Sequence, residues 1–449
     1  MSTVIKLRKG LDINLQGKAK PEVLYVKTPE MYAIFPEDFT GITPKVMVKE
    51  QEAVKGGDVL FVDKNHPELK IVSPVSGTIT AVVRGERRKV LYISIKPDAN
   101  QTNVDFGMTK VDSLNATTAK ELLLKTGLFA FIKQRPYDVV ADPTIAPRDI
   151  FITGFDSAPL APDFELALKG EEEYFQLGLT LLSKIATTHL SISAKQTSPA
   201  LTTAKNVTVH IFDGPHPAGN TGVQINHIAP VNKGETVWTL NAETVLFIGR
   251  VVATGVVDQT RLVAVVGSEV KNPAYCKLKA GAQITPALEN QVNKQTSLRY
   301  ISGNPLTGKR IDADGFLGAF HGQITVIPEG DDNHEMFGWI MPRLNQFSTS
   351  HSYFSWLLGK KEYALDARIK GGERHMIMSA EYDNVLPMDI LSEYLIKAII
   401  AGDIDRMEKL GIYEVAPEDF ALCEFVCSSK MELQRIVRNG LDMLRKEMC

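Results

Sequence analysis

The segment from Val54 to Ile95 constrains the fold most, because it reads as a series of short β-strands separated by turns. Val59, Phe61 and Asp63 alternate with Leu60 and Val62, so one face is apolar and the other mixed, as a half-buried strand requires. Thr78 to Val83 is rich in β-branched residues, and Val90 to Ile95 alternates again. Turn-forming residues interrupt these runs at 65–67, 73–74, 76–77 and 85–86. The segment therefore predicts a small β domain built from hairpins.

The order of these parts resembles the barrel-sandwich hybrid fold of biotinyl and lipoyl domains. The matching elements are V-K-G-G-D-V-L at 54–60 and S-P-V-S-G-T-I at 73–79. In carrier domains of this fold a hairpin between the two halves presents a lysine that is covalently modified. Here that hairpin would contain Lys64 and Lys70, and neither stands in an M-K-M or D-K-A setting. A structural domain with solvated turn lysines is favoured, and a lipoyl- or biotinyl-type carrier protein stays as an alternative.

The composition is that of an ordinary globular protein with room for about three domains. The chain has 449 residues, of which 44% are hydrophobic and 23% charged. Its net charge of −3 gives no sign of a nucleic-acid partner. The first residues lack the apolar core of a signal peptide, and no apolar run has the length of a membrane span. We expect a protein that is soluble when isolated and cytoplasmic.

The middle and the end of the chain have different periodicities. Ile150 to Thr153 reads as a buried strand and Glu171 to Ile185 as an amphipathic helix. This alternation of strands and helices predicts an α/β domain with a parallel sheet. Apolar residues recur at helical spacing from Pro387 to Ala401, and Met431 to Met448 is also expected to be helical. The end of the chain is therefore predicted to be a small helical domain.

A loop rich in glycine and proline, Asp213 to Ile228, directly follows a predicted strand. It contains neither G-K-[ST] nor G-x-G-x-x-G, and its prolines remove N–H donors, so a nucleotide-phosphate loop is not expected. Ligands of α/β proteins nevertheless bind at the carboxyl ends of such strands.

Six motifs follow one another along nearly the whole chain. They are L-R-K-G-L-D at 7–12, V-L-F-V-D-K at 59–64, R-G-E-R-R-K-V-L at 84–91, D-S-A-P-L-A-P-D at 156–163, G-P-H-P-A-G-N-T-G at 214–222 and R-Y-I-S-G-N-P-L-T-G at 299–308. Their order closely resembles that of the A subunits of the Na+-translocating NADH:quinone oxidoreductases.

This resemblance implies a multidomain α/β and β architecture in four parts. They are a barrel-sandwich hybrid at 1–105, a Rossmann-like α/β domain at 106–257, a β-grasp (SLBB-like) domain with a connecting segment at 258–377, and a C-terminal helical domain at 378–449.

The resemblance also implies a peripheral subunit of a respiratory complex that oxidises NADH, reduces quinone to quinol and exports Na+. The subunit would not be active alone. Its partners would be the other subunits, chiefly a membrane subunit, at the cytoplasmic face of the bacterial inner membrane. NADH, flavins, iron–sulfur centres, quinone and Na+ would be bound on or through those other subunits. The alternative is a ligand-free scaffold subunit of an Rnf-like electron-transfer complex.

The family is similar in turn to the flavin- and iron–sulfur-carrying subunits of the Rnf complex and complex I. Those relatives hold FMN with a G-x-G-G-A-G-F-P loop. The corresponding stretch here is T-G-L-F-A-F-I-K-Q-R-P at 126–136, where only Gly127 remains. Phenylalanines would fill the space that glycines leave for a phosphate, so the resemblance implies that FMN binding is lost.

The cysteines depart from the ferredoxin pattern as well. A cluster of that type needs four thiolates. With Cys423 and Cys427 as the last two ligands, Pro417 and Phe420 occupy the first two positions. We therefore expect no metal and no cofactor in this subunit, with Cys423 and Cys427 as a vestigial iron–sulfur pair. No role is assigned to the other two cysteines, Cys276 and Cys449.

The subunit is expected to contribute to quinone reduction or to assembly of the complex. Any quinone site on this chain needs an apolar trough for the quinone ring and hydrogen-bond donors for its two carbonyl oxygens. Aromatic and donor side chains are interleaved where the relatives hold their flavin. The candidate quinone-binding residues are Phe129, Phe131, Arg135, Tyr137 and His216. Core packing of the aromatic residues is the alternative.

Overall fold

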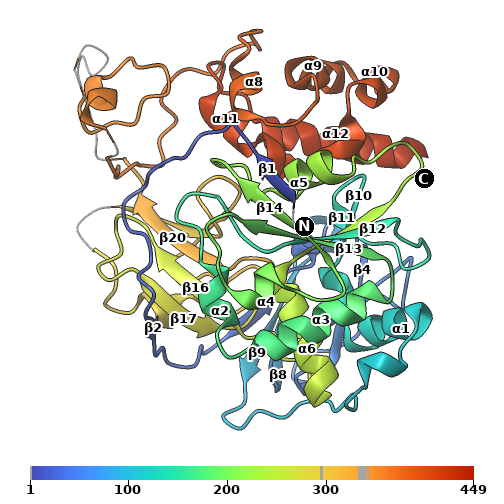
Figure 1. Cartoon of the computed structure of the whole chain (residues 1–449). Helices are drawn as coiled ribbons and strands as arrows, with labels where there is room; N and C mark the ends of the chain where they lie inside the picture. Colours follow the sequence, from blue (N-terminus) through green and yellow to red (C-terminus); the bar gives the residue numbers. More distant parts are fainter. Residues whose placement is uncertain (1–2, 294–296, 332–340, 342, 360, 449) are drawn as a thin grey trace.

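The computed structural model describes residues 3–293, 297–331, 341, 343–359 and 361–448. In this part of the chain the strands form four sheets, and helices gather at the C-terminal end (Figure 1).

Two small antiparallel sheets form the N-terminal part, with strand orders β3-β9-β8-β5 and β4-β6-β7. Leu60, Ile79 and Ile93 are fully buried in the apolar core beneath them. The predicted hairpin is confirmed, since β6 and β7 pair antiparallel. The strands are β3 (Tyr32–Ile34), β4 (Pro44–Val46), β5 (Ala53–Val54), β6 (Val59–Asp63), β7 (Lys70–Val72), β8 (Gly77–Arg84) and β9 (Val90–Pro97).

Strand β6 is more deeply buried than its alternating sequence predicts. Leu60 and Phe61 are both fully buried, and Asp63 is only 3% exposed. The Asp63 carboxylate tolerates burial because it accepts hydrogen bonds from the backbone N–H groups of Thr43, at 2.8 Å, and His66, at 3.2 Å. The expectation of a half-buried strand was therefore wrong here.

The largest sheet has seven strands in the order β1-β14-β13-β12-β15-β10-β11. The first five run parallel, and β10 pairs antiparallel with β15. Its edge strand β1 comes from the start of the chain. The strands are β1 (Thr3–Lys6), β10 (Lys133–Arg135), β11 (Val139–Val140), β12 (Asp149–Thr153), β13 (Thr187–Ser193), β14 (Thr208–Asp213) and β15 (Val237–Asn241).

Helices cover both faces of this sheet, as the predicted α/β arrangement requires (Figure 1). On one face α3 (Glu172–Ser183) packs against α6 (Ala242–Thr254), and on the other lies α5 (Thr221–Ile228). Asn241 begins α6 because its side chain accepts a hydrogen bond from the Thr244 N–H. The remaining helices of residues 100–300 are α1 (Ala116–Thr126), α2 (Phe164–Leu168), α4 (Pro199–Thr202) and α7 (Thr285–Leu288).

A six-stranded mixed sheet follows, with the order β19-β18-β20-β16-β17-β2. Strand β2 again comes from the N-terminal residues and pairs parallel with β17. The apolar side chains of this sheet continue the core of the preceding sheets. The strands are β2 (Val23–Leu24), β16 (Arg261–Val266), β17 (Ala274–Leu278), β18 (Leu298–Ser302), β19 (Lys309–Ile311) and β20 (Gln323–Pro328).

The C-terminal helices pack on each other and on the large sheet beside α5 (Figure 1). They are α8 (Glu381–Val385), α9 (Ser392–Ala401), α10 (Ile404–Lys409), α11 (Ala421–Val426) and α12 (Leu433–Met448). None of the helices in the described ranges has the length and hydropathy that crossing a bilayer requires.

Candidate functional site

The large sheet has a switch point between β12 and β15. The strands that follow β12 in sequence, β13 and β14, lie on one side of it, and β15 lies on the other. Loops leaving two such neighbouring strands part in opposite directions and open a crevice at the carboxyl end of the sheet. A cavity of about 230 Å³ lies there, lined by Thr153 at the end of β12 and Asn241 at the end of β15.

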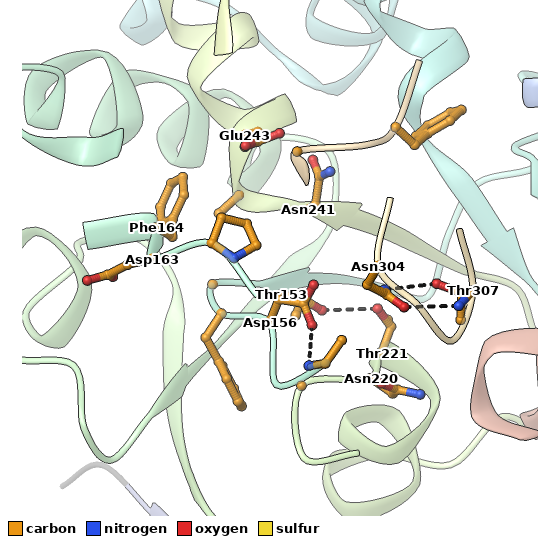
Figure 2. Close-up of a pocket in the computed structure, with 18 of the residues that line it drawn as sticks. Thr153, Asp156, Asp163, Phe164, Asn220, Thr221, Asn241, Glu243, Asn304 and Thr307 are labelled. Atoms are coloured by element: carbon orange, nitrogen blue, oxygen red, sulfur yellow. Dashed lines mark hydrogen bonds between the residues drawn. The ribbon is translucent and has the colours of Figure 1, made fainter. Parts of the chain in front are cut away.

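Three parts of the chain close this switch-point cavity. Figure 2 shows side chains from the α/β domain, among them Asp156 and Asn220, together with Asn304 from the hairpin between β18 and β19. Glu418, from the 3₁₀ helix Pro417–Phe420, completes the lining. A ligand in the cavity would therefore touch residues that are more than 250 positions apart in the sequence.

The hydroxyl groups at the base of the cavity are already hydrogen-bonded to protein. The Thr153 hydroxyl donates to Gln224 Oε1 at 2.9 Å. It also lies 3.0 Å from the Thr221 hydroxyl (Figure 2). One Asp156 carboxylate oxygen accepts from the Ala158 N–H at 2.7 Å. These bonds hold the base of the cavity in a defined shape.

All charged side chains among the described residues that line the cavity are acidic: Asp156, Asp163, Glu243 and Glu418. Burial raises the pKa of Asp156 and of Glu243. Loss of hydration, and then repulsion from Asp419, raises the pKa of Glu418 to about 7. An anion such as a phosphate would meet carboxylates and no lining Lys or Arg, so the cavity suits an uncharged or cationic ligand.

His216 places an uncharged imidazole ring in the lining of this cavity. Its Nδ1 lies 3.0 Å from the Ser157 Oγ, which already accepts from the Gly219 N–H at 2.8 Å. In the tautomer in which the Ser157 hydroxyl donates to Nδ1, the ring proton lies on Nε2. His216 is 4% exposed, and Nε2 has no hydrogen-bond partner among the described residues. Burial lowers the pKa of His216 to about 4, so the ring is uncharged near neutral pH.

The two predicted phenylalanines lie in the apolar core. They belong to the 3₁₀ helix Leu128–Phe131, and Phe129 is 1% and Phe131 is 5% exposed. Phe129 packs edge-on against Trp238 with ring centroids 5.1 Å apart, and Phe131 packs against Phe39 at 5.7 Å. Neither lines the switch-point cavity.

Arg135 and Tyr137 lie apart from the cavity too. Arg135 is 1% exposed, and its guanidinium reaches Glu418 Oε1 at 3.1 Å and Asp419 Oδ2 at 3.5 Å. It touches the cavity only through Glu418. Tyr137 lines a different hollow, with Gln134 and other residues. Of the five predicted residues, His216 alone lines the switch-point cavity.

Sequence reasoning missed the residues that share the cavity with His216. Asp156 belongs to the D-S-A-P-L-A-P-D motif, and Asn241 is the last residue of β15. Both lie at or just after the ends of strands of a parallel sheet, which was the available signal. Glu418 gave no such signal, because its place depends on how the C-terminal helices pack.

The cysteines in the described ranges are buried thiols. Cys423 on α11 and Cys427 just after it are 0% and 1% exposed, and Cys427 Sγ lies 2.9 Å from the Tyr382 hydroxyl. Burial raises the pKa of Cys423 and raises that of Cys276 to about 12. In the described part of the chain, no group of three or more His, Cys, Asp or Glu side chains is placed to hold a metal ion. Cys449 lies outside the described residues.

Of the two lysines in the hairpin between β6 and β7, only Lys64 is exposed on the turn. Lys70 is half-buried as the first residue of β7.

Comparison with known proteins gives the same family along nearly the whole chain. Residues 5–98 match the NqrA N-terminal barrel-sandwich hybrid domain, 114–257 the NqrA second alpha/beta domain, and 262–313 the NQRA C-terminal (SLBB) domain. These matches and the sheets described above confirm the predicted fold class.

Curated relatives match at full length. The A subunits of the Na(+)-translocating NADH-quinone reductases of Haemophilus influenzae (strain PittGG) and Neisseria meningitidis serogroup B are each 34% identical over 99% of this chain and 100% of their own. The corresponding protein of Photorhabdus laumondii is 33% identical over the same shares. A solved NAD+-reducing [NiFe]-hydrogenase resembles about half of the chain, at 15% identity and a TM-score of 0.34. The chain thus belongs to the NqrA family, the A subunits of the Na(+)-translocating NADH-quinone reductases, which are oxidoreductase complexes.

Proposed function

We propose that this chain works as the A subunit of a Na+-translocating NADH:quinone reductase and binds the quinone headgroup in the switch-point cavity. The observation that carries the proposal is the buried, uncharged His216, whose Nε2 has no partner among the described residues. A buried ring nitrogen without a partner costs free energy, and a quinone oxygen that accepts a hydrogen bond from protonated Nε2 would recover that cost.

A quinone matches the chemistry of the lining. Its two carbonyl oxygens accept hydrogen bonds, and its ring is uncharged and largely apolar. Phe155, Phe164, Leu262 and Leu306 supply apolar surface beside His216. The volume of about 230 Å³ is below the roughly 300 Å³ at which ordinary ligand pockets begin, so the cavity would take the ring and leave the tail outside.

Of the other four predicted residues, three would stabilise the structure around this site without touching the ligand. Phe129 and Phe131 fix the core under β15, and Arg135 holds the Glu418 side chain of the cavity wall. Tyr137 lies two residues after Arg135 and lines a different hollow. We propose no catalytic residue in this chain.

We further propose that the subunit carries no redox cofactor of its own. The phosphate of FMN would face the carboxylates of Asp156 and Glu243 in the switch-point cavity, which argues against a flavin there. Electrons would reach the quinone from cofactors on other subunits. The subunit would lie at the cytoplasmic face of the bacterial inner membrane, held chiefly by a membrane subunit, and would be soluble when isolated.

Quinone titration of the isolated chain tests the binding site. Ubiquinone-1, a short-tailed quinone, should bind the unchanged chain, and His216→Leu should weaken binding about tenfold by removing one hydrogen bond. His375→Leu is the matched control, because His375 is exposed and does not line the cavity. Equal quinone affinity of the His216→Leu and His375→Leu proteins would mean that the quinone does not bind in this cavity. No binding to any of them would leave the scaffold alternative.

A further inference from the structure

An exposed apolar segment stands apart from the cavity. The 3₁₀ helix Phe354–Leu358 carries four large apolar side chains toward solvent: Phe354 is 55%, Trp356 49%, Leu357 63% and Leu358 50% exposed. Ser355, between them, is 1% exposed. Single exposed apolar residues are ordinary, but four within five residues form a patch that marks a contact surface.

The segment projects from a well-anchored base. Phe347 packs against Tyr363 and Phe425 with ring centroids 5.5 Å and 5.9 Å apart. Tyr363 is 6% exposed, its N–H donates to the Asn14 carbonyl at 2.8 Å, and its own carbonyl accepts from the Gln16 N–H at 3.0 Å. Figure 1 shows the resulting lobe standing out beside the C-terminal helices. Packed contacts on both sides of the exposed segment in the sequence therefore tie the lobe to the rest of the protein.

Local contacts also give the lobe a defined form. The Trp356 ring lies 5.1 Å from the His351 ring, and the Arg343 guanidinium lies 5.7 Å from the Tyr353 ring. Lys361 Nζ donates to the Leu344 carbonyl at 3.1 Å. Positive side chains thus flank the apolar segment on both sides in the sequence.

The charge of this region is opposite to that of the whole chain. Residues 341–374 contain six Lys or Arg and three Asp or Glu, whereas the chain has a net charge of −3. Asp366 is already bonded to Arg368 at 2.7 Å and lies 3.6 Å from Lys370. An anionic surface would be attracted to this lobe and not to an average face of the protein.

We propose that Phe354–Leu358 inserts into the headgroup region of an anionic lipid bilayer. Trp prefers the membrane–water interface, and Phe and Leu beside it bury apolar area at the boundary of the acyl chains. Flanking Lys and Arg side chains add attraction to anionic headgroups. This contact is additional to the proposed docking on a membrane subunit, and it does not depend on the proposed quinone site.

Vesicle binding by the isolated full chain tests the proposal. The chain should sediment with vesicles made of phosphatidylcholine and phosphatidylglycerol in equal parts. Its binding to vesicles of phosphatidylcholine alone should be weaker by a factor of about ten or more. The double variant Leu357→Asp/Leu358→Asp should bind the mixed vesicles at least tenfold more weakly than the unchanged chain. It lacks the two leucine side chains that the bilayer would bury. Met108→Asp is the control, since Met108 is 79% exposed and far from the lobe in the sequence.

Tryptophan fluorescence locates the contact. The chain has three tryptophans: Trp238 is fully buried, Trp339 lies outside the described residues, and Trp356 lies in the exposed segment. A blue shift on vesicle addition that Trp356→Phe abolishes would therefore assign insertion to this segment. Absence of vesicle binding at low salt would overturn the proposal, and so would equal binding by the double aspartate variant. A Trp356 shift that appears only with the detergent-solubilised membrane subunit would assign the segment to a protein partner instead. Matched circular dichroism of all variants checks the fold.

Discussion

Arg135 Nη2 lies 3.1 Å from Glu418 Oε1, although the two residues are 283 positions apart in the chain. This contact joins strand β10 of the large sheet to the C-terminal helices. Arg135 is 1% exposed and also faces Asp419, which is fully buried, and Asp138. A charge network at this depth ties the wall of the switch-point cavity to the packing of two parts of the chain.

Arg135→Ala should destabilise the fold by about 3–5 kcal/mol, because it leaves the buried Asp419 carboxylate without its cation. Urea denaturation followed by circular dichroism measures this loss. Arg406→Ala is the matched control: Arg406 is 76% exposed in its pair with Asp403, so the cost should stay below about 1 kcal/mol. Equal midpoints for the two variants would mean that the buried network contributes little to stability.

Stability should fall as the pH drops from 6.5 toward 4, in part because of His216. Burial lowers its pKa from 6.5 to about 4, so in this window the unfolded chain binds a proton that the folded chain does not. The contribution is fully present above pH 6.5 and lost as pH falls through 4, and amounts to about 3 kcal/mol.

Denaturation midpoints measured across pH for His216→Leu and the unchanged chain test this assignment. The variant should lose less stability between pH 6.5 and 4. Some dependence should remain, because burial also lowers the pKa of His321 to about 4. Identical pH profiles for both proteins would contradict the buried, neutral state of His216.

Local pattern was enough to predict the hairpins of residues 54–95 and the alternation that gives the α/β sheet. The strands that pair with β1 and β2 could not be predicted from local pattern. Both β1 and β2 belong to the first residues of the chain, and they join two sheets whose other strands come much later in the sequence. The same limit applied to the site. His216 was predicted because its loop follows a strand, whereas Glu418 reaches the cavity only through tertiary packing. Arg135 was predicted to donate a hydrogen bond to the ligand, but in the structure its guanidinium forms ion pairs with Glu418 and Asp419.

Gly249→Ala and Gly178→Ala should each destabilise the fold by about 1–3 kcal/mol through overpacking. These glycines lie where α6 crosses α3: a Cβ on Gly249 would collide with the Tyr174 carbonyl, and one on Gly178 with the Val245 carbonyl. Thermal unfolding measures the loss. Gly372→Ala is the control, since among the described residues no heavy atom beyond its two chain neighbours lies within 4 Å of the position that its added methyl group would take. Unchanged melting of both helix variants would show that α3 and α6 can separate without cost.

The thiols of Cys276, Cys423 and Cys427 should not react with a disulfide reagent such as DTNB until the protein unfolds. Each is at most 1% exposed, and burial raises the pKa of Cys276 and Cys423, which removes the reactive thiolate. A Cys449→Ser protein isolates these three, because Cys449 lies outside the described residues.

The same preparation, purified without oxygen, should show no flavin or iron–sulfur absorbance, as the proposal of a cofactor-free subunit requires. Rapid labelling of Cys423 or Cys427 in the folded protein would contradict their burial, and a broad visible absorbance lost with Cys423→Ser would assign these two cysteines to a metal site.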